Sequence, residues 1–158
     1  MSETKTDSRL PNLFRKAVEA TPDITRGYQE GLQALGKGKS KIQATDTRKL
    51  KGSVDIDSCT EKLYPESSRW DYTIGHDQSV YFIEIHPAST SDVSTMLKKL
   101  EWLKAWLKDK APELEKLKAR ENPYVWLASG RVNILSGSKW QRQLAQKGLV
   151  PPREKLKL

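Results

Sequence analysis

Residues 80–107 read VYFIEIHPASTSDVSTMLKKLEWLKAWL, and this stretch decides the fold. Its first seven residues alternate as in a strand, with Glu84 and His86 on one face and Ile83 and Ile85 on the other. A run this apolar predicts a central strand that is covered on both faces. A carboxylate inside such a strand is costly unless it is paired or bound to a cation. Glu84 is therefore the first candidate site residue.

The second half of the stretch predicts the longest helix of the chain. Pro87 predicts the end of the strand, and Thr90 or Ser91 is the expected N-cap. Apolar residues then recur at intervals of three and four, which is typical of a helix that packs on a sheet. Lys98 and Lys99 occupy other positions around this helix.

Two more strands are expected upstream. Residues 70–75, WDYTIG, predict a strand that the HDQS turn joins to the 80–86 strand as a hairpin. Residues 52–57, GSVDID, alternate so that Asp55 and Asp57 share a polar face. These two acids are candidate metal ligands, or simply the wet side of an edge strand.

The N-terminal third predicts helices and a basic loop. Helical spacing from Leu10 ends at Thr21-Pro22, and a second helical piece should run from Asp23 or Thr25 to Gly36, with Glu30 near its middle. Residues 36–41, GKGKSK, lack the GxxxxGK[ST] spacing of a phosphate-binding loop. They are a loop whose charges either touch phosphates or are solvated.

Downstream, residues 123–129 predict a buried strand that residues 131–135 continue or pair with across Gly130. Ser138 should cap a short helix that ends at Gly148. We expect one domain over 10–148, with a flexible N-terminal tail at 1–9 and a basic C-terminal tail at 149–158.

The composition of the chain indicates the cellular compartment in which the protein is expected. The chain has 158 residues and a single cysteine, Cys59, so it forms no internal disulfide. It shows no signal peptide and no run of about 18 apolar residues. These features predict a cytoplasmic protein without a membrane partner.

Charge is unevenly distributed along the chain, whose formal net charge is +8. Residues 51–90 carry 7 acidic and 3 basic side chains, whereas residues 91–158 carry 7 acidic and 15 basic ones. Basic flanks around an acidic centre suit a polyanion held at the rim of a cation site, and they also suit a merely solvated surface.

The expected order of elements is a helix, three strands, a helix and a strand. This order resembles the restriction-endonuclease-like, or PD-(D/E)xK, nuclease superfamily, which implies an α/β (α+β) fold with an α-β-β-β-α-β core and a mixed central sheet flanked by helices. Asp71 in RWDYTIG matches the first carboxylate of the motif, and Glu84 with His86 in FIEIH matches the (D/E)xK element. The resemblance implies that Asp71 and Glu84 bind Mg²⁺ or Mn²⁺, joined by a helical carboxylate, either Glu30 or Glu19.

The sequence departs from that motif at two positions. Trp70 replaces its proline, and His86 stands where its lysine is expected. A histidine there acts as a general base or ligates a metal. Lys98 and Lys99 are candidate phosphate contacts, and either one is an alternative source of the missing lysine.

The resemblance implies a divalent-metal-dependent nuclease, a phosphodiester hydrolase of DNA or RNA, with Asp71, Glu84 and His86 as catalytic residues. The alternative is a non-catalytic domain of the same fold that binds nucleic acid, a protein partner in a larger assembly, or a second copy of the chain.

Overall fold

The computed structural model describes residues 11–158, so the tail expected at residues 1–9 lies outside the described part. A mixed four-stranded sheet forms the centre, in the order β2-β3-β4-β5. Its strands are β2 (Leu50–Asp55), β3 (Tyr72–His76), β4 (Ser79–Ser89) and β5 (Tyr124–Asn133). The pairs β2–β3 and β3–β4 are antiparallel, whereas β4–β5 is parallel. The class expected from the sequence, a mixed α/β fold, is confirmed.

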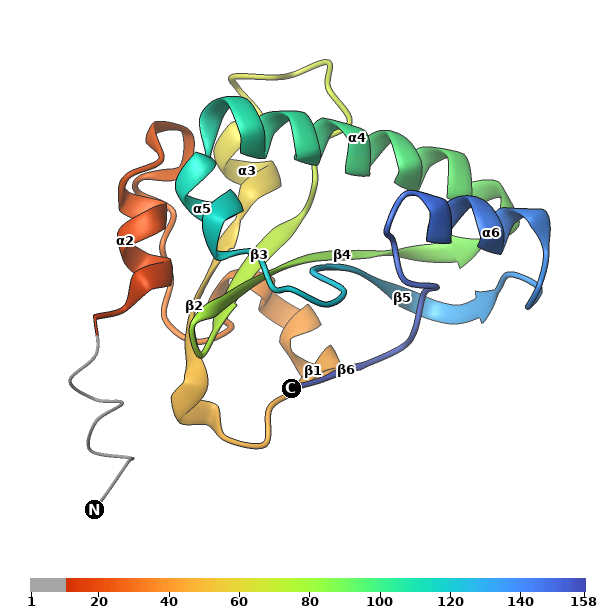
Figure 1. Ribbon diagram of the computed structural model, residues 1–158, viewed down its shortest axis with the longest axis horizontal. Coiled ribbons are helices and arrows are strands. Elements are labelled where there is room, and N and C mark those ends of the chain that lie inside the picture. The colour runs from red at the N-terminus through yellow and green to blue at the C-terminus, as the bar shows by residue number, and fades with distance from the viewer. Residues whose placement is uncertain (1–10) are drawn as a thin grey trace.

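Helices and shorter elements surround the sheet (Figure 1). The α-helices are α2 (Leu13–Glu19), α3 (Ile56–Thr60), α4 (Val93–Lys110), α5 (Pro112–Leu117) and α6 (Lys139–Gln146). The 3-10 segments are η1 (Pro22–Ile24), η2 (Gln33–Lys41), η3 (Thr47–Lys49) and η4 (Thr90–Asp92). A second, two-stranded sheet pairs β1 (Ile42–Gln43) with β6 (Leu156–Lys157) in parallel.

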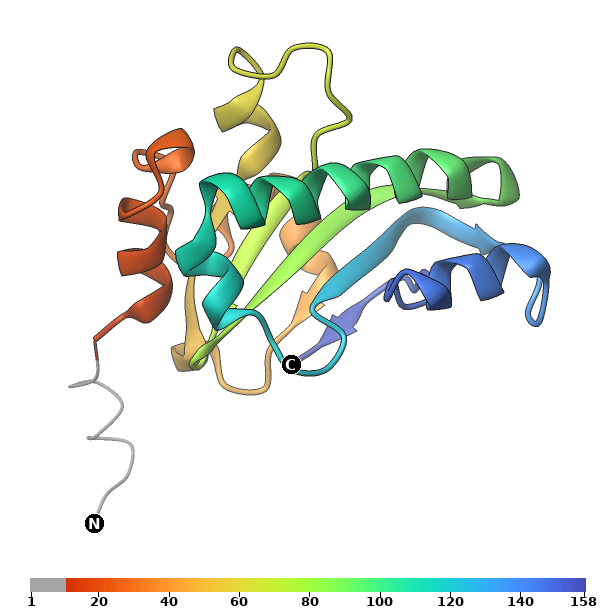
Figure 2. The ribbon, with the colours of Figure 1, turned by 45° about the horizontal axis from the view of Figure 1, so that its top comes forward.

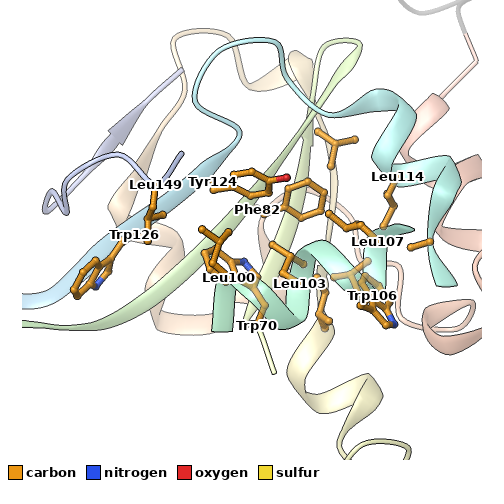
Figure 3. Packing of buried hydrophobic residues seen from close by; sticks show 14 of the residues in the cluster. Trp70, Phe82, Leu100, Leu103, Trp106, Leu107, Leu114, Tyr124, Trp126 and Leu149 are labelled. Atoms are coloured by element: carbon orange, nitrogen blue, oxygen red, sulfur yellow. The ribbon is translucent and has the colours of Figure 1, made fainter. Parts of the chain in front are cut away.

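β4 is covered on both faces, as its apolar sequence predicts. On one face α4 lies across the sheet, and the residues between them form the larger core (Figures 2 and 3). Labelled members of this core are Trp70, Phe82, Leu100, Leu103, Trp106, Leu107, Leu114, Tyr124, Trp126 and Leu149. On the other face a smaller core joins Ile83 and Leu127 to Leu35 of η2 and Leu156 of β6. Two separate cores therefore fix β4 in the middle of the domain.

The expected hairpin is confirmed. β3 and β4 pair from Tyr72 opposite Ile83 to His76 opposite Ser79, which leaves a two-residue turn. Asp77 in that turn has φ 57°, a conformation that aspartate tolerates better than most side chains. β3 begins at Tyr72, two residues later than the sequence pattern suggested.

Three boundaries differ from the sequence predictions. β2 ends at Asp55, because the Asp55 carboxylate accepts the Ser58 N–H and starts α3 instead of extending the strand to 57. β4 continues through Pro87 to Ser89, and the register shifts between His86 and Ala88, since proline brings no N–H to the ladder. Ser89 and Asp92 then form a capping box, so the N-cap is Ser89 and not Thr90 or Ser91, and the helical segment begins at Thr90.

The second N-terminal helix is absent from the described residues. Between η1 and η2 the chain instead pairs Gln29 with Ser53 of β2. Gly31 and Gly36 both have positive φ, which interrupts a helical run.

The C-terminal segment 149–158, expected as a tail outside the domain, contributes to the fold. Leu149 and Leu156 are buried, and the Leu158 N–H donates to the Gln43 carbonyl at 2.8 Å. The charges of this segment obscure its alternate apolar residues in the sequence. Within residues 11–158, no helix has the length and apolar character needed to cross a membrane.

The pairing of β6 with β1 predicts the effect of shortening one buried side chain of β6. Leu156→Ala should lower the free energy of unfolding by about 2 kcal/mol or more, because it empties a buried site of the smaller core. Leu135→Ala is the matched control, since Leu135 is 79% exposed and its loss should cost no more than about 0.5 kcal/mol. Urea unfolding of both variants measures the difference, and equal midpoints would contradict a structural role for β6.

Candidate active site

Two main-chain N–H groups orient the carboxylates of Asp71 and Glu84. Asp71 immediately precedes β3, whose last residue pair with β4 at this end is Tyr72 opposite Ile83. The Asp71 N–H donates to Glu84 Oε1 at 3.0 Å, and the Ile85 N–H donates to Asp71 Oδ2 at 3.2 Å. Each carboxylate therefore has one oxygen held by a main-chain N–H, which orients both groups without a flexible partner.

The remaining oxygens face one lysine. Lys99 lies on α4, and its Nζ donates to Glu84 Oε2 at 2.6 Å and lies 3.9 Å from Asp71 Oδ1. Residues from the start of β3, the middle of β4 and the second turn of α4 thus meet at one point. The sequence named Asp71 and Glu84 as a pair, and it named Lys99 only as one of two alternatives to His86.

Burial dominates the electrostatics of this cluster. The Glu84 side chain is 1% exposed, while those of Asp71 and Lys99 are 21% and 18% exposed. Burial raises the pKa of Glu84 to about 8, the Asp71 charge adds to this, and Lys99 opposes it. Burial likewise raises the pKa of Asp71, with the Lys99 charge acting in the opposite direction. A second positive charge at the site would favour the ionised form of both acids.

The other candidate acids already have partners at the edge of the cluster. Asp55 accepts the Ser58 N–H at 2.9 Å, and Asp57 accepts from the Arg69 guanidinium at 2.7 Å. Burial raises the pKa of the Tyr72 hydroxyl, and the charges of Asp71, Asp55, Glu84 and Asp57 add to it in that order. All four acids are thus close enough to act on Tyr72, but only two share Lys99.

His86 follows Glu84 on the same strand, yet its ring contacts a different group. Its Nδ1 lies 2.9 Å from the Pro87 carbonyl oxygen and 3.8 Å from Asp92 Oδ1. Because a carbonyl can only accept, this hydrogen bond requires a proton on Nδ1. Among the described residues, no hydrogen bond joins His86 to Asp71 or Glu84.

The remaining candidates do not join the cluster through any hydrogen bond within residues 11–158. Glu30 is exposed and follows the Gln29–Ser53 bridge. Glu19 pairs with Arg15 on the outside of α2. Lys98 is exposed on α4, next to the half-buried Lys99.

The carboxylates of this cluster provide few ligands for a metal ion, so they suit only a weakly bound cation. Within residues 11–158, no group of three or more His, Cys, Asp or Glu side chains is arranged to hold a metal ion. Asp71 Oδ1 and Glu84 Oε2 are the two oxygens that face the same point. Mg²⁺ is commonly bound by one or two carboxylates and completes its shell with water and substrate phosphate. Two carboxylates are therefore sufficient for that ion and insufficient for a closed structural site.

The one residue of the cluster that sequence patterns ranked low is Lys99. Its position follows from α4 crossing β4, a tertiary arrangement that a strand motif does not encode. In the sequence Lys99 lies outside the apolar pattern of α4, beside Lys98, so the pattern alone did not distinguish the two lysines.

Comparisons with known proteins add no relative. No family model matches this chain, and no curated protein and no solved structure is significantly similar to it. Geometry and chemistry therefore carry the functional assignment.

The raised pKa of Glu84 predicts a pH-dependent stability. The carboxyl ordinarily ionises near pH 4.5, whereas burial in the folded state delays ionisation to about pH 8. The folded state therefore binds the proton more tightly, so stability from this group is fully present below pH 4.5 and is lost as the pH rises toward 8.

Glu84→Gln removes this titration and retains an acceptor for the Asp71 N–H. The melting temperature of Glu84→Gln minus that of the wild type should increase steadily from pH 5 to pH 8. Glu101→Gln, at an exposed position of α4, is the control and should show a constant difference. Thermal unfolding across this pH range measures both, and a flat difference for Glu84→Gln would refute a raised pKa.

Proposed function

We propose that this chain is a divalent-metal-dependent nuclease of the PD-(D/E)xK type, in which Lys99 from α4 replaces the lysine missing from the ExH element. The observation that carries the proposal is the meeting of Lys99 Nζ with Glu84 Oε2 at 2.6 Å and with Asp71 Oδ1 at 3.9 Å. The order of elements and the antiparallel–parallel sheet are consistent with the α-β-β-β-α-β core of that superfamily.

In this proposal Asp71 and Glu84 hold Mg²⁺ or Mn²⁺ through the two oxygens that face Lys99. The bound ion would supply Lewis-acid stabilisation of a phosphodiester and lower the pKa of a water. Lys99 is the cation of this chain that lies against both acids, so it is suited to neutralise phosphate charge and to orient the attacking water. Water would attack phosphorus and give up a proton while the bond to the leaving oxygen breaks and that oxygen takes up a proton.

His86 has a separate role in the proposal. Its Nδ1 is committed to the Pro87 carbonyl and lies near Asp92, which fixes the ring at the end of β4. From there it is a candidate for handling a proton through Nε2 or for contacting the substrate, and its removal should cost less activity than the loss of Lys99.

The main alternative is a non-catalytic domain that binds nucleic acid or a protein. One observation favours it: Lys99 and the two main-chain N–H groups already satisfy the paired acids without a metal. A cation has to compete with this ammonium group. Metal binding is thus the property that separates the two functions.

The first functional test measures metal binding and cleavage together. Purified protein is incubated with supercoiled plasmid, linear duplex, single-stranded DNA and RNA in Mg²⁺, Mn²⁺ or chelator. We expect metal-dependent cleavage and an increase in melting temperature with the metal, because a ligand that binds only the folded state stabilises it. Glu84→Gln and Asp71→Asn should each reduce cleavage at least about 100-fold, since each removes charge that a hard cation requires.

Absence of both cleavage and a metal-induced thermal shift would refute the enzyme and leave the binding domain. A thermal shift that survives in both Glu84→Gln and Asp71→Asn would place the metal elsewhere.

A second test compares the two candidates for the missing lysine. Lys99→Gln should reduce the cleavage rate about 100-fold, the usual cost of removing one charge-stabilising donor. Lys98→Gln, at the exposed neighbouring position, should leave the rate within a few-fold of the wild type. His86→Gln should fall between them and change the pH dependence of the rate.

The order of the three rates decides the assignment. If His86→Gln loses more activity than Lys99→Gln, the histidine is the functional equivalent of the motif lysine. Melting temperatures measured in parallel show whether a variant has lost activity through unfolding.

A further inference from the structure

The basic segment GKGKSK, residues 36–41, lies on the face of the sheet opposite α4. It forms the second part of η2, after Gly36, whose φ of 55° and ψ of −126° break the 3-10 segment. Leu35 before it and Ile42 after it are buried in the smaller core. The segment is therefore anchored at both ends by apolar side chains.

Gly38 brings this segment against the site. A Cβ added at Gly38 would overlap Cδ1 of Ile85, so the backbone of the basic segment directly covers that side chain. Ile85 is the residue whose N–H holds Asp71 Oδ2. The backbone at residue 38 is thus one side chain away from the strand segment that positions the acids.

Two lysines flank Gly38 and point their charge into solvent. Lys37 and Lys39 are both exposed, and neither forms an ion pair with a carboxylate within residues 11–158. Some exposed basic side chains do form such pairs, as Arg15 does with Glu19 and Lys116 does with Glu113. Unpaired cations beside an acidic centre leave a local positive potential that attracts phosphate.

β3 begins at Tyr72, opposite Ile83, so β4 has no antiparallel neighbour after Ile83. The site lies at this end of the β3–β4 ladder. α4, with Lys98 exposed, flanks it on one face of the sheet, and η2, with Lys37 and Lys39, flanks it on the other. Exposed lysines thus lie on the elements that cover both faces of the sheet at this end of the ladder.

We propose that Lys37 and Lys39 form a phosphate-contacting rim that holds the nucleic-acid backbone from the sheet face opposite α4. This inference rests on the proposed function for the identity of the polyanion. It assigns to the GKGKSK segment the phosphate contact that its sequence left undecided.

The test is the salt dependence of nucleic-acid binding, measured in chelator so that no cleavage occurs. Labelled duplex DNA, single-stranded DNA and RNA are titrated with the full chain at several salt concentrations. The double variant Lys37→Gln/Lys39→Gln should reduce the slope of log K against log salt by about 1.8 for a duplex or about 1.4 for a single strand, the loss of two phosphate contacts. The nucleic acid that the wild type binds most tightly at one fixed salt concentration is the preferred form.

Lys108→Gln/Lys110→Gln is the matched control. It removes the same charge at the same spacing from two exposed positions at the far end of α4. Its slope should equal that of the wild type. Equal melting temperatures of the two double variants exclude a difference in folding.

The outcomes separate this inference from the proposed function. An unchanged slope for Lys37→Gln/Lys39→Gln, an equal loss in the control, or no binding by the wild type overturns the rim. If the slope falls as expected but no metal-dependent cleavage occurs, the rim stands and the hydrolase is refuted. If cleavage occurs and the slope is unchanged, the hydrolase stands and the rim is refuted.

Discussion

The arrangement of this protein depends on one buried carboxylate. An ion removed from water costs several kcal/mol unless charges and hydrogen bonds compensate it. Glu84 receives the Asp71 N–H on one oxygen and the Lys99 ammonium on the other, so both oxygens are satisfied inside a side chain that is only 1% exposed. Meeting this requirement fixes where β3 begins and how α4 lies on the sheet.

The same requirement divides the carboxylate oxygens into two sets with different partners. Main-chain N–H groups, which cannot move independently of the sheet, orient one oxygen of each acid. A flexible lysine side chain faces the other two. In the proposed function, a divalent cation at that point would compete with the ammonium group and would not need the oxygens that the main-chain N–H groups hold. This separation of the oxygens is the physical basis for proposing a site and not only a structural ion pair.

The two cores determine which elements cover the faces of β4 around this cluster. α4 covers one face of β4, while η2 and β6 cover the other. β3 pairs with one edge of β4 as far as Tyr72, where the β3–β4 ladder stops. Beyond that residue the covering elements are a lysine-bearing helix and a lysine-bearing 3-10 segment. Lysines therefore lie on the elements that cover both faces of the sheet near the acidic pair. In the sequence, likewise, basic segments lie on both sides of an acidic middle segment.

Sequence alone determined the elements whose patterns are local. Alternation in residues 80–86, the short HDQS connection and the three-four spacing of α4 each depend on neighbouring residues, so they predicted the hairpin, the doubly covered strand and the helix across the sheet. The pairing of Asp71 with Glu84 was expected from the resemblance to the nuclease motif, and in the structure the Asp71 N–H donates to Glu84 Oε1. Local competition moved the boundaries, because the side chain of Asp55 capped a helix and Pro87 was accommodated by a register shift within the strand.

Tertiary structure alone decided which cation faces the acids. The sequence favoured His86 over Lys99, but the crossing of α4 over β4 brings Lys99 to Glu84, while the Pro87 carbonyl and Asp92 hold the His86 ring. The pairing of β6 with β1 and the contact of Gly38 with Ile85 were likewise hidden, since each joins segments that are far apart in the chain. Side-chain periodicity reports which face a residue takes, whereas the partner on that face depends on how separate elements pack.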